Sequence, residues 1–252
     1  MPNAIVTGAS RGIGVALSKA LAGAGFHVEA LARDLPAMEV AYGGEIASGQ
    51  VTCTELDILD ATAVDAFFAS RYGSGQSLDL VFNNAGRFVS LAPLWDADRT
   101  DWWSDIEVNL RGTFNVLGAA VRRMRQDDRG IIINMGGGRP TGASAYAISK
   151  AGVAEMTRAL NLELRQVGSN VAVFLADPGL VDTAMTRRHF ASPLGPTWVP
   201  ELVNRVGAGD TRAPTEIAEK LIAQLPYLTA GASGQMFTPD TPTGTFDPIP
   251  PQ

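Results

Sequence analysis

Short apolar runs alternate along the chain with longer segments in which apolar residues recur at helical spacing. The apolar runs predict strands at 4–7, 27–32, 51–56, 78–82, 131–134, 170–176 and 234–237. The longer segments predict helices near 15–24, 62–71, 101–125, 145–166 and 214–225, with a region of helix and turn reaching residue 49. This alternation is typical of an α/β fold built on a doubly wound parallel β-sheet. We therefore expect helices on both faces of the sheet.

The pattern predicts one domain over residues 1–252, because an α/β chain of this length can bury a single continuous core. The periodicity weakens in the last third of the chain. Residues 184–212 contain prolines and no sustained period, and we expect a loop or helical lid over a substrate site. Residues 238–252 are rich in proline, so we predict an extended C-terminal tail that can pack along a neighbouring subunit.

Composition narrows the classes of partner. The net charge is −6 and no lysine- or arginine-rich run occurs, so we expect neither a nucleic acid nor a membrane surface as partner. The first predicted strand begins almost at Met1, with no basic leader or long apolar segment before it, and we expect a cytoplasmic protein. Neither Cys53 nor His189 has metal-ligating residues for company in the sequence, so we expect no metal site.

A glycine-rich segment joins the first predicted strand to the first long helix. Gly8 allows a tight turn, Gly12 lets a phosphate approach the backbone, and Gly14 lets the helix pack closely on the strand. The backbone N–H groups and the positive end of the helix suit a dinucleotide pyrophosphate, as in Rossmann-type folds. The residues expected to bind it are Gly8, Ser10, Arg11, Gly12, Ile13 and Gly14. An ordinary β-to-α turn is the alternative interpretation.

The end of the second predicted strand indicates which dinucleotide binds. An acidic residue there would accept hydrogen bonds from a free ribose 2′ hydroxyl, but the strand ends at Ala32 and Arg33. The Arg33 guanidinium suits a 2′-phosphate instead, and Arg11 could flank the same group. We therefore predict NADP(H) as the cofactor, with two ordinary surface arginines as the alternative.

Taken together, the motifs resemble those of the short-chain dehydrogenase/reductase family, in order over nearly the whole chain. They are Thr7 to Gly14, Asp57, Asn83-Asn84-Ala85-Gly86, Asn109, Tyr146 with Lys150, and Pro178-Gly179 followed by Thr183. The resemblance implies a Rossmann-type fold, an NAD(P)-dependent oxidoreductase, and a homodimer or homotetramer.

The resemblance also implies roles for further residues. The adenine would lie against Asp57 and Ile58, and the nicotinamide carboxamide would be held by Thr183. The other cofactor-binding residues implied are Asn83, Ala85, Gly86, Pro178, Gly179 and Val181. A turn-capping role for Asp57 and a helix N-cap role for Thr183 are the alternatives.

Tyr146 and Lys150 are four residues apart on a predicted helix and so share one face. A nearby ammonium stabilises a phenolate, so we expect Lys150 to lower the pKa of Tyr146. Tyr146 would then act as general acid in carbonyl reduction and as general base in the reverse direction. Lys150 would also hold the nicotinamide ribose, and the resemblance implies that Asn109 anchors a water linking Lys150 to solvent. An exposed helix pair is the alternative.

The sequence departs from the family pattern at the strand before this helix. Family members usually carry a serine there, where this chain has Gly136 or Gly137. Ser144 is the nearest replacement and Thr141 the second, although Ser144 also suits a helix N-cap. The glycines suggest that a bulky substrate could enter the vacated volume.

In the lid, Arg187, Arg188 and His189 could meet an anionic substrate or form a solvated surface. The leading prediction for the whole chain is an NADPH-dependent ketoreductase that interconverts a ketone and a secondary alcohol of a small or medium organic molecule. One alternative is the same fold repurposed for non-redox cyclisation or isomerisation, with Tyr146 as an acid. The other alternative is a catalytically silent NADP-binding protein.

Overall fold

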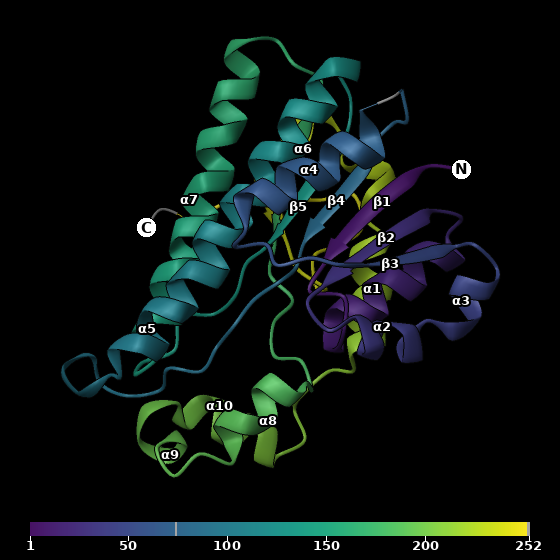
Figure 1. Cartoon of the computed structure of the whole chain (residues 1–252). Coiled ribbons are helices and arrows are strands. Elements are labelled where there is room, and N and C mark those ends of the chain that lie inside the picture. The colour runs from purple at the N-terminus through teal and green to yellow at the C-terminus, as the bar shows by residue number, and fades with distance from the viewer. Residues whose placement is uncertain (74, 251–252) are drawn as a thin grey trace.

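The computed structural model describes residues 1–73 and 75–250. It contains one central β-sheet (Figure 1). Its strands are β1 Asn3–Thr7, β2 His27–Ala32, β3 Val51–Glu55, β4 Leu80–Asn83, β5 Ile131–Met135, β6 Ala172–Ala176, β7 Gln235–Phe237 and β8 Asp247–Pro248. They lie in the order β3-β2-β1-β4-β5-β6-β7-β8, and every neighbouring pair is parallel except β7 and β8. The predicted doubly wound sheet is confirmed, with an antiparallel edge strand that the pattern did not predict.

Helices cover both faces of this sheet. They are α1 Gly12–Gly23, α2 Leu35–Ala41, α3 Gly43–Ala47, α4 Ala61–Tyr72, α5 Arg99–Ile106, α6 Thr113–Asp127, α7 Ser144–Gln166, α8 Ala184–Phe190, α9 Gly195–Trp198, α10 Pro200–Gly207 and α11 Pro214–Ile222. Side chains of α1, α2 and α11 pack on one face, and those of α4, α6 and α7 pack on the other (Figure 1). A π-helical segment, Glu107–Gly112, joins α5 to α6 where the sequence predicted one continuous helix.

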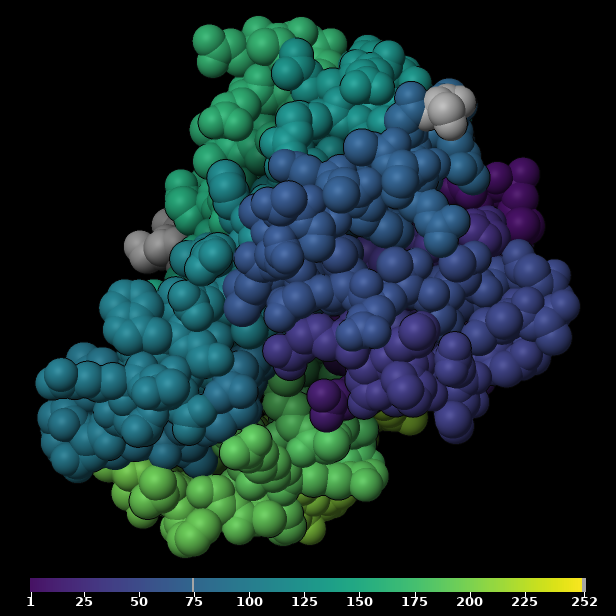
Figure 2. Space-filling model, viewed as in Figure 1, coloured from purple at the N-terminus to yellow at the C-terminus, as the bar shows by residue number. Residues whose placement is uncertain are grey.

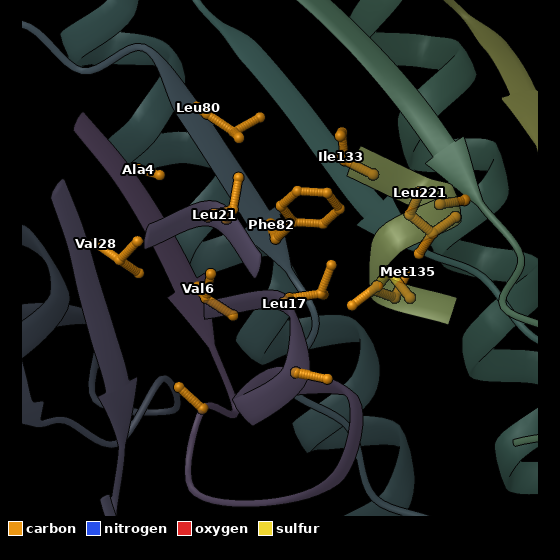
Figure 3. Close-up of a cluster of buried hydrophobic side chains, with 14 of the residues drawn as sticks. Ala4, Val6, Leu17, Leu21, Val28, Leu80, Phe82, Ile133, Met135 and Leu221 are labelled. Atoms are coloured by element: carbon orange, nitrogen blue, oxygen red, sulfur yellow. The ribbon is translucent and has the colours of Figure 1, made fainter. Parts of the chain in front are cut away.

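The central strand β1 shows why apolar runs identified the strands. Ala4 and Val6 face the cluster beneath α1, whereas Ile5 between them faces the opposite cluster. Successive side chains of a strand point to opposite faces, so a strand covered on both sides needs apolar residues throughout. Figure 3 shows the first cluster, in which Leu17 of α1 packs with Val6 and Phe82 of the sheet.

The predicted lid, residues 184–212, contains the helices α8, α9 and α10, so of the two interpretations the helical one is correct. Figure 1 shows these helices beyond the carboxyl ends of the strands, apart from the two layers that cover the sheet. In the space-filling view they lie against the segment around residue 100 (Figure 2). Their inner side chains form a small cluster with residues of the loops that follow β4 and β5.

The C-terminal tail packs on its own chain through β8. The Phe246 ring lies 5.6 Å from that of Phe174 and 6.1 Å from that of Phe237, and Ile249 is buried in a cluster with Val153 and Leu175. These contacts extend the sheet by one short strand beyond β7, which corresponds to the last strand that the sequence predicts. Within residues 1–73 and 75–250, no helix has the length and apolar character needed to cross a bilayer.

The turn between β1 and α1 is packed so closely that only glycine fits at two positions. A Cβ atom on Gly14 would lie 2.2 Å from the carbonyl oxygen of Gly8. A Cβ atom on Gly8, whose φ is +66°, would lie 2.7 Å from the Cα atom of Ala85. The Thr7 hydroxyl oxygen accepts hydrogen bonds from the backbone N–H groups of Asn84 and Ala85, both at 3.0 Å. The turn after β1 is therefore held against the turn after β4.

Replacing Gly14 by alanine is expected to lower the free energy of unfolding by about 1–3 kcal/mol, because the new methyl group meets backbone atoms that are themselves held in place. Urea denaturation without ligand measures the change. The matched control is Gly23→Ala at the end of the same helix, where a Cβ atom would meet nothing within 4 Å. That variant should be unchanged or more stable by up to about 1 kcal/mol. Equal stabilities for the two variants would contradict the conclusion that Gly14 is closely packed against Gly8.

Candidate active site

The carboxyl ends of β1, β4, β5 and β6 bring the motifs together, because these ends share one edge of a parallel sheet. Two distances show how close the motifs lie to one another. The Lys150 Nζ atom donates a hydrogen bond of 2.8 Å to the carbonyl oxygen of Met135, the last residue of β5. A Cβ atom on Gly12, after β1, would lie 3.4 Å from the methyl carbon of Thr183, after β6.

The N-terminus of α1 fits a pyrophosphate. Its N-cap residue, Arg11, makes no side-chain capping hydrogen bond, and the first turn contains no acidic residue. The backbone N–H groups of this turn are therefore not capped by a side chain. Gly12 has a left-handed φ of +56° and carries no side chain that would block the approach to these groups. A group with negative charge is favoured at such a helix end.

Arg33 and Asp57 lie side by side just after the neighbouring strands β2 and β3. Their charged groups are 3.9 Å apart, and both side chains are exposed. The Asp57 Oδ1 atom also accepts a hydrogen bond of 2.9 Å from the backbone N–H of Leu59, so the turn-capping interpretation is confirmed. Ile58 is buried and its carbonyl oxygen accepts a hydrogen bond from Asn115. The binding of a 2′-phosphate and of adenine here stays a prediction.

Asn83 ties the end of β4 to its neighbours. Its Nδ2 atom donates to Asn134 Oδ1 of β5 at 3.1 Å and to the carbonyl oxygen of Thr113 at 3.3 Å. Asn134 in turn donates to the Thr157 hydroxyl of α7 at 3.0 Å. A Cβ atom on Gly86 would lie 3.3 Å from Asn109 Oδ1 and 3.8 Å from Lys150 Nζ, so Gly86 keeps the space beside the lysine clear.

Asn109 lies in the π-helical segment and is wholly buried. Its Oδ1 atom accepts from the backbone N–H of Arg87 at 2.6 Å, and its Nδ2 atom donates to the Arg87 carbonyl oxygen at 2.7 Å and to the Ser149 hydroxyl at 3.0 Å. Local π-helical turns often occur at functional sites. Here the Asn109 side chain braces the loop that follows Gly86, and its predicted role in holding a water stays a prediction.

Tyr146 and Lys150 lie together on α7, with Lys150 Nζ 5.7 Å from the centre of the Tyr146 ring. They are not an exposed pair, since Lys150 is only 7% exposed. Burial lowers the pKa of Lys150 to about 8, and the Asp177 carboxylate opposes this shift. Burial raises the pKa of Tyr146, and the charges of Asp177 and Asp105 raise it further. The expected lowering of the tyrosine pKa is therefore not found in this structure, because burial of the phenol and the two nearby carboxylates all raise it.

Gly137 lies opposite the phenol. A Cβ atom on Gly137 would be 2.5 Å from the Tyr146 Oη atom, so the phenol itself fills the space beside this glycine. The phenol takes the space directly beside Gly137, but Gly136, Gly137 and Gly138 also line a cavity, so entry of a bulky substrate beside these glycines stays a prediction. A cavity of about 320 Å³ lies nearby and is lined by Lys150, Asp177 and Leu175 among others.

The two candidate hydroxyl groups before Tyr146 are placed differently. Helix α7 begins at Ser144 and its N-cap is Ala143, so the capping role suggested for Ser144 is wrong. Instead, the Ser144 hydroxyl oxygen accepts a hydrogen bond of 2.8 Å from Trp102 Nε1. Thr141 is exposed in the loop before the helix. A substrate contact of either residue stays a prediction.

The lid reaches the site through a histidine. His189 is 2% exposed, its Nε2 atom lies 2.9 Å from the carbonyl oxygen of Phe88, and burial lowers its pKa. The solvated-surface role suggested for His189 is therefore wrong, and contact with an anionic substrate stays a prediction. Arg187 pairs with Asp182 at 2.7 Å. Thr183 caps α8 by accepting from the backbone N–H of Thr186 at 3.3 Å, which confirms its predicted capping role.

The remaining residues after β6 shape the backbone. Gly179 has a φ of +68°, in the left-handed region that favours glycine, and its N–H donates to the Asp177 carboxylate at 3.0 Å. Val181 is buried and pairs with Arg212 in an isolated β-bridge. These contacts fix the path from Pro178 to the start of the lid, and cofactor binding by this segment stays a prediction.

Two residues of the site were missed by the sequence reasoning. The Phe88 ring stacks on the Tyr146 ring, with centroids 4.6 Å apart and planes 20° from parallel. Asp105 is fully buried, accepts from the backbone N–H groups of Val89 and Ser90, and pairs with Arg87 at 2.9 Å. Asp105 lies four residues before Asn109 and so on the same helix face, which is a signal that could have found it. Nothing in the local sequence identified Phe88.

Comparison with known proteins agrees with this geometry. A family model described as short chain dehydrogenase matches residues 2–193. The chain therefore belongs to the short-chain dehydrogenase/reductase family. Galactitol 2-dehydrogenase from Rhizobium johnstonii is 30% identical over 244 residues, which cover 92% of this chain and 90% of that protein.

Two further similarities cover almost the whole chain. The 3-oxoacyl-acyl-carrier-protein reductase from Chlamydia trachomatis is 31% identical over 245 residues, covering 94% of this chain and 95% of that protein. A crystal structure of an actinorhodin polyketide ketoreductase variant with NADPH superposes with a TM-score of 0.79 and 26% identity, covering 94% of this chain and 95% of the other. The chain is thus an oxidoreductase of a family that typically uses NAD(P).

The buried lysine should make stability depend on pH. The pKa of Lys150 falls on folding from its usual 10.5 to about 8, so between these values the unfolded chain binds more protons at this site than the native chain. The cost of holding the buried ammonium therefore grows as pH falls through this window, to about 3 kcal/mol. In urea denaturation, the stability of Lys150→Met relative to wild type should decrease as pH rises from neutral to 10.5. A difference that does not change with pH would contradict the buried charge.

Proposed function

We propose that this chain is an NADPH-dependent oxidoreductase that interconverts a ketone and a secondary alcohol, with Tyr146 as the proton donor in the direction of reduction. The observation that carries the proposal is the placement of the Tyr146 phenol and the Lys150 ammonium by one face of α7 at the carboxyl end of β5. NADPH, when bound, supplies a hydride. The protein's task is to bind both molecules at this edge and to provide the proton.

Binding of the dinucleotide is assigned to the turn after β1 and to the ends of β2 and β3. The uncapped N-terminus of α1 would hold the pyrophosphate, and Arg33 would hold the 2′-phosphate. The Asp57 carboxylate beside Arg33 would turn to the adenine. The NADPH found with the related ketoreductase supports this choice of cofactor.

Proton supply is assigned to Tyr146 and Lys150. The Tyr146 phenol is protonated at neutral pH and so has a proton to donate, although burial, which raises its pKa, also makes it a weaker acid. The phenolate left after donation needs a proton, and Lys150, with a pKa of about 8, still carries one at pH 7. The missing serine donor would slow the reaction by roughly 10²-fold or more relative to a site with both hydroxyls.

The substrate class follows from the chemistry that the site supports. A single protonated phenol beside a proposed dinucleotide site suits the reduction of a carbonyl group. The similar proteins are named as a galactitol 2-dehydrogenase, a 3-oxoacyl-acyl-carrier-protein reductase and a polyketide ketoreductase. We also propose a homodimer or homotetramer. Exposed apolar side chains on α6 and α7, Phe114, Ile148 and Leu162, support such an assembly.

Replacing Tyr146 by phenylalanine should remove the proton donor and keep the ring. With a panel of ketones, loss of NADPH absorbance should be at least about 10²-fold slower in this variant than in wild type, while NADPH binding by calorimetry is retained. Product formation without net loss of NADPH would contradict the redox proposal in favour of a rearrangement. Tight NADPH binding by wild type without turnover of any ketone would favour a sensing protein.

Replacing Arg33 by alanine should remove the cation at the predicted 2′-phosphate. The dissociation constant for NADPH should rise by about tenfold or more and that for NADH should stay nearly constant, because NADH lacks this phosphate. The matched control is Arg122→Ala, an exposed arginine paired with Asp65 between α6 and α4. An unchanged preference for NADPH over NADH in the Arg33 variant would show that another group reads the phosphate.

A further inference from the structure

The Tyr146 side chain is confined from two directions. On one side the Phe88 ring covers it, with centroids 4.6 Å apart. At its far end the Oη atom occupies a place 2.5 Å from the position that a Cβ atom on Gly137 would take. Such a separation is far inside van der Waals contact. The phenol keeps this position only if residue 137 has no side chain.

A flexible tyrosine could simply turn away from a new methyl group, so the importance of Gly137 depends on whether Phe88 can move. The backbone on both sides of Phe88 is held by buried side chains. Asn109 bonds both the N–H and the carbonyl oxygen of Arg87, and Asp105 accepts from the N–H groups of the two residues after Phe88.

Phe88 itself is held by His189 of helix α8. Its carbonyl oxygen lies 2.9 Å from His189 Nε2, and the His189 ring stacks on the phenylalanine ring with centroids 3.7 Å apart. Asp105, Asn109 and His189 are each 2% exposed or less. The rings of His189, Phe88 and Tyr146 therefore form one continuous stack, which joins the lid helix α8 to the phenol.

We infer that Phe88 and Gly137 act as a matched pair that sets the position of the Tyr146 phenol, Phe88 as the wall behind the ring and Gly137 as the space in front of the oxygen. Phe88 is a positioning residue in this scheme, since it acts through Tyr146. The expected effect on kcat rests on the proposed function, whereas the expected coupling of the two residues in stability does not. It implies that a serine placed at residue 137 would displace the phenol rather than restore a second hydroxyl donor.

A double-mutant cycle tests the pair, with Gly137→Ala, Phe88→Ala and the double variant. Two quantities are measured: kcat for a ketone with NADPH, and the midpoint of thermal unfolding without ligand. Gly137→Ala should lower kcat by about tenfold or more and lower the midpoint when Phe88 is present. In the Phe88→Ala background the same change should cost less than about twofold in kcat, because the phenol has already lost its fixed position. It should also leave the midpoint nearly constant, because the phenol can move aside without a clash.

The matched control is Gly138→Ala, one residue further on, where a Cβ atom would meet nothing within 4 Å. This variant should resemble wild type in both measurements. Gly137→Ser should also lower kcat in wild type and do so less in the Phe88→Ala background. If Phe88→Ala does not fold, Phe88→Leu removes the ring and keeps much of the apolar volume.

Three results would overturn the inference: an effect of Gly137→Ala that is equal in both backgrounds, no effect of Gly137→Ala at all, or higher activity in Gly137→Ser. The thermal midpoints separate this failure from failure of the proposed function. If wild type reduces no ketone, the cycle of midpoints still shows whether the two residues are coupled. If wild type is active and the midpoints are additive, only the pair is wrong.

Discussion

The site depends on how closely helix α7 approaches the carboxyl end of β5. Two side chains of the helix make the contact: Lys150 donates to the last carbonyl of the strand, and the Tyr146 oxygen occupies the place that a side chain at residue 137 would need. The hydrogen bond between Asn134 and Thr157 fixes the same helix about two turns after Lys150. A residue larger than glycine at this point would separate helix from strand or turn the phenol away.

The remaining contacts serve to hold that arrangement still. Two buried side chains, Asp105 of α5 and Asn109 of the π-helical segment, accept hydrogen bonds from backbone N–H groups of the loop after β4. Helix α8 contributes His189, whose Nε2 atom lies within hydrogen-bond distance of the same loop. Preorganised groups of this kind are what acid catalysis needs, because a proton donor that is already in place requires no rearrangement when charge develops on the substrate. Burial, which raises the pKa of Tyr146, leaves the phenol protonated at neutral pH but makes it a weaker acid, so its fixed position matters all the more.

Much of the fold could be predicted from the sequence because the strands of a sheet covered on both faces are nearly continuous apolar runs. The strand β8 could not, since it is two residues long and its pairing depends on Phe246 meeting Phe174 and Phe237 from distant parts of the chain. The motif residues of the site could also be predicted, because each motif is a short stretch of neighbouring residues in the sequence. The roles of Phe88 and His189 could not be predicted, because their contact joins positions 101 residues apart. The burial that raises the Tyr146 pKa likewise depends on packing between distant segments of the chain.

In the proposed function, hydrogen moves at this edge of the sheet between a nicotinamide and a carbonyl carbon, and Tyr146 supplies the proton to the oxygen. The most direct test uses NADPH carrying deuterium at the transferable position of the nicotinamide, and a ketone that the enzyme turns over. Mass spectrometry and NMR of the product should find one deuterium on the carbinol carbon, on a single stereochemical face. A product formed with no deuterium at that carbon would contradict the account.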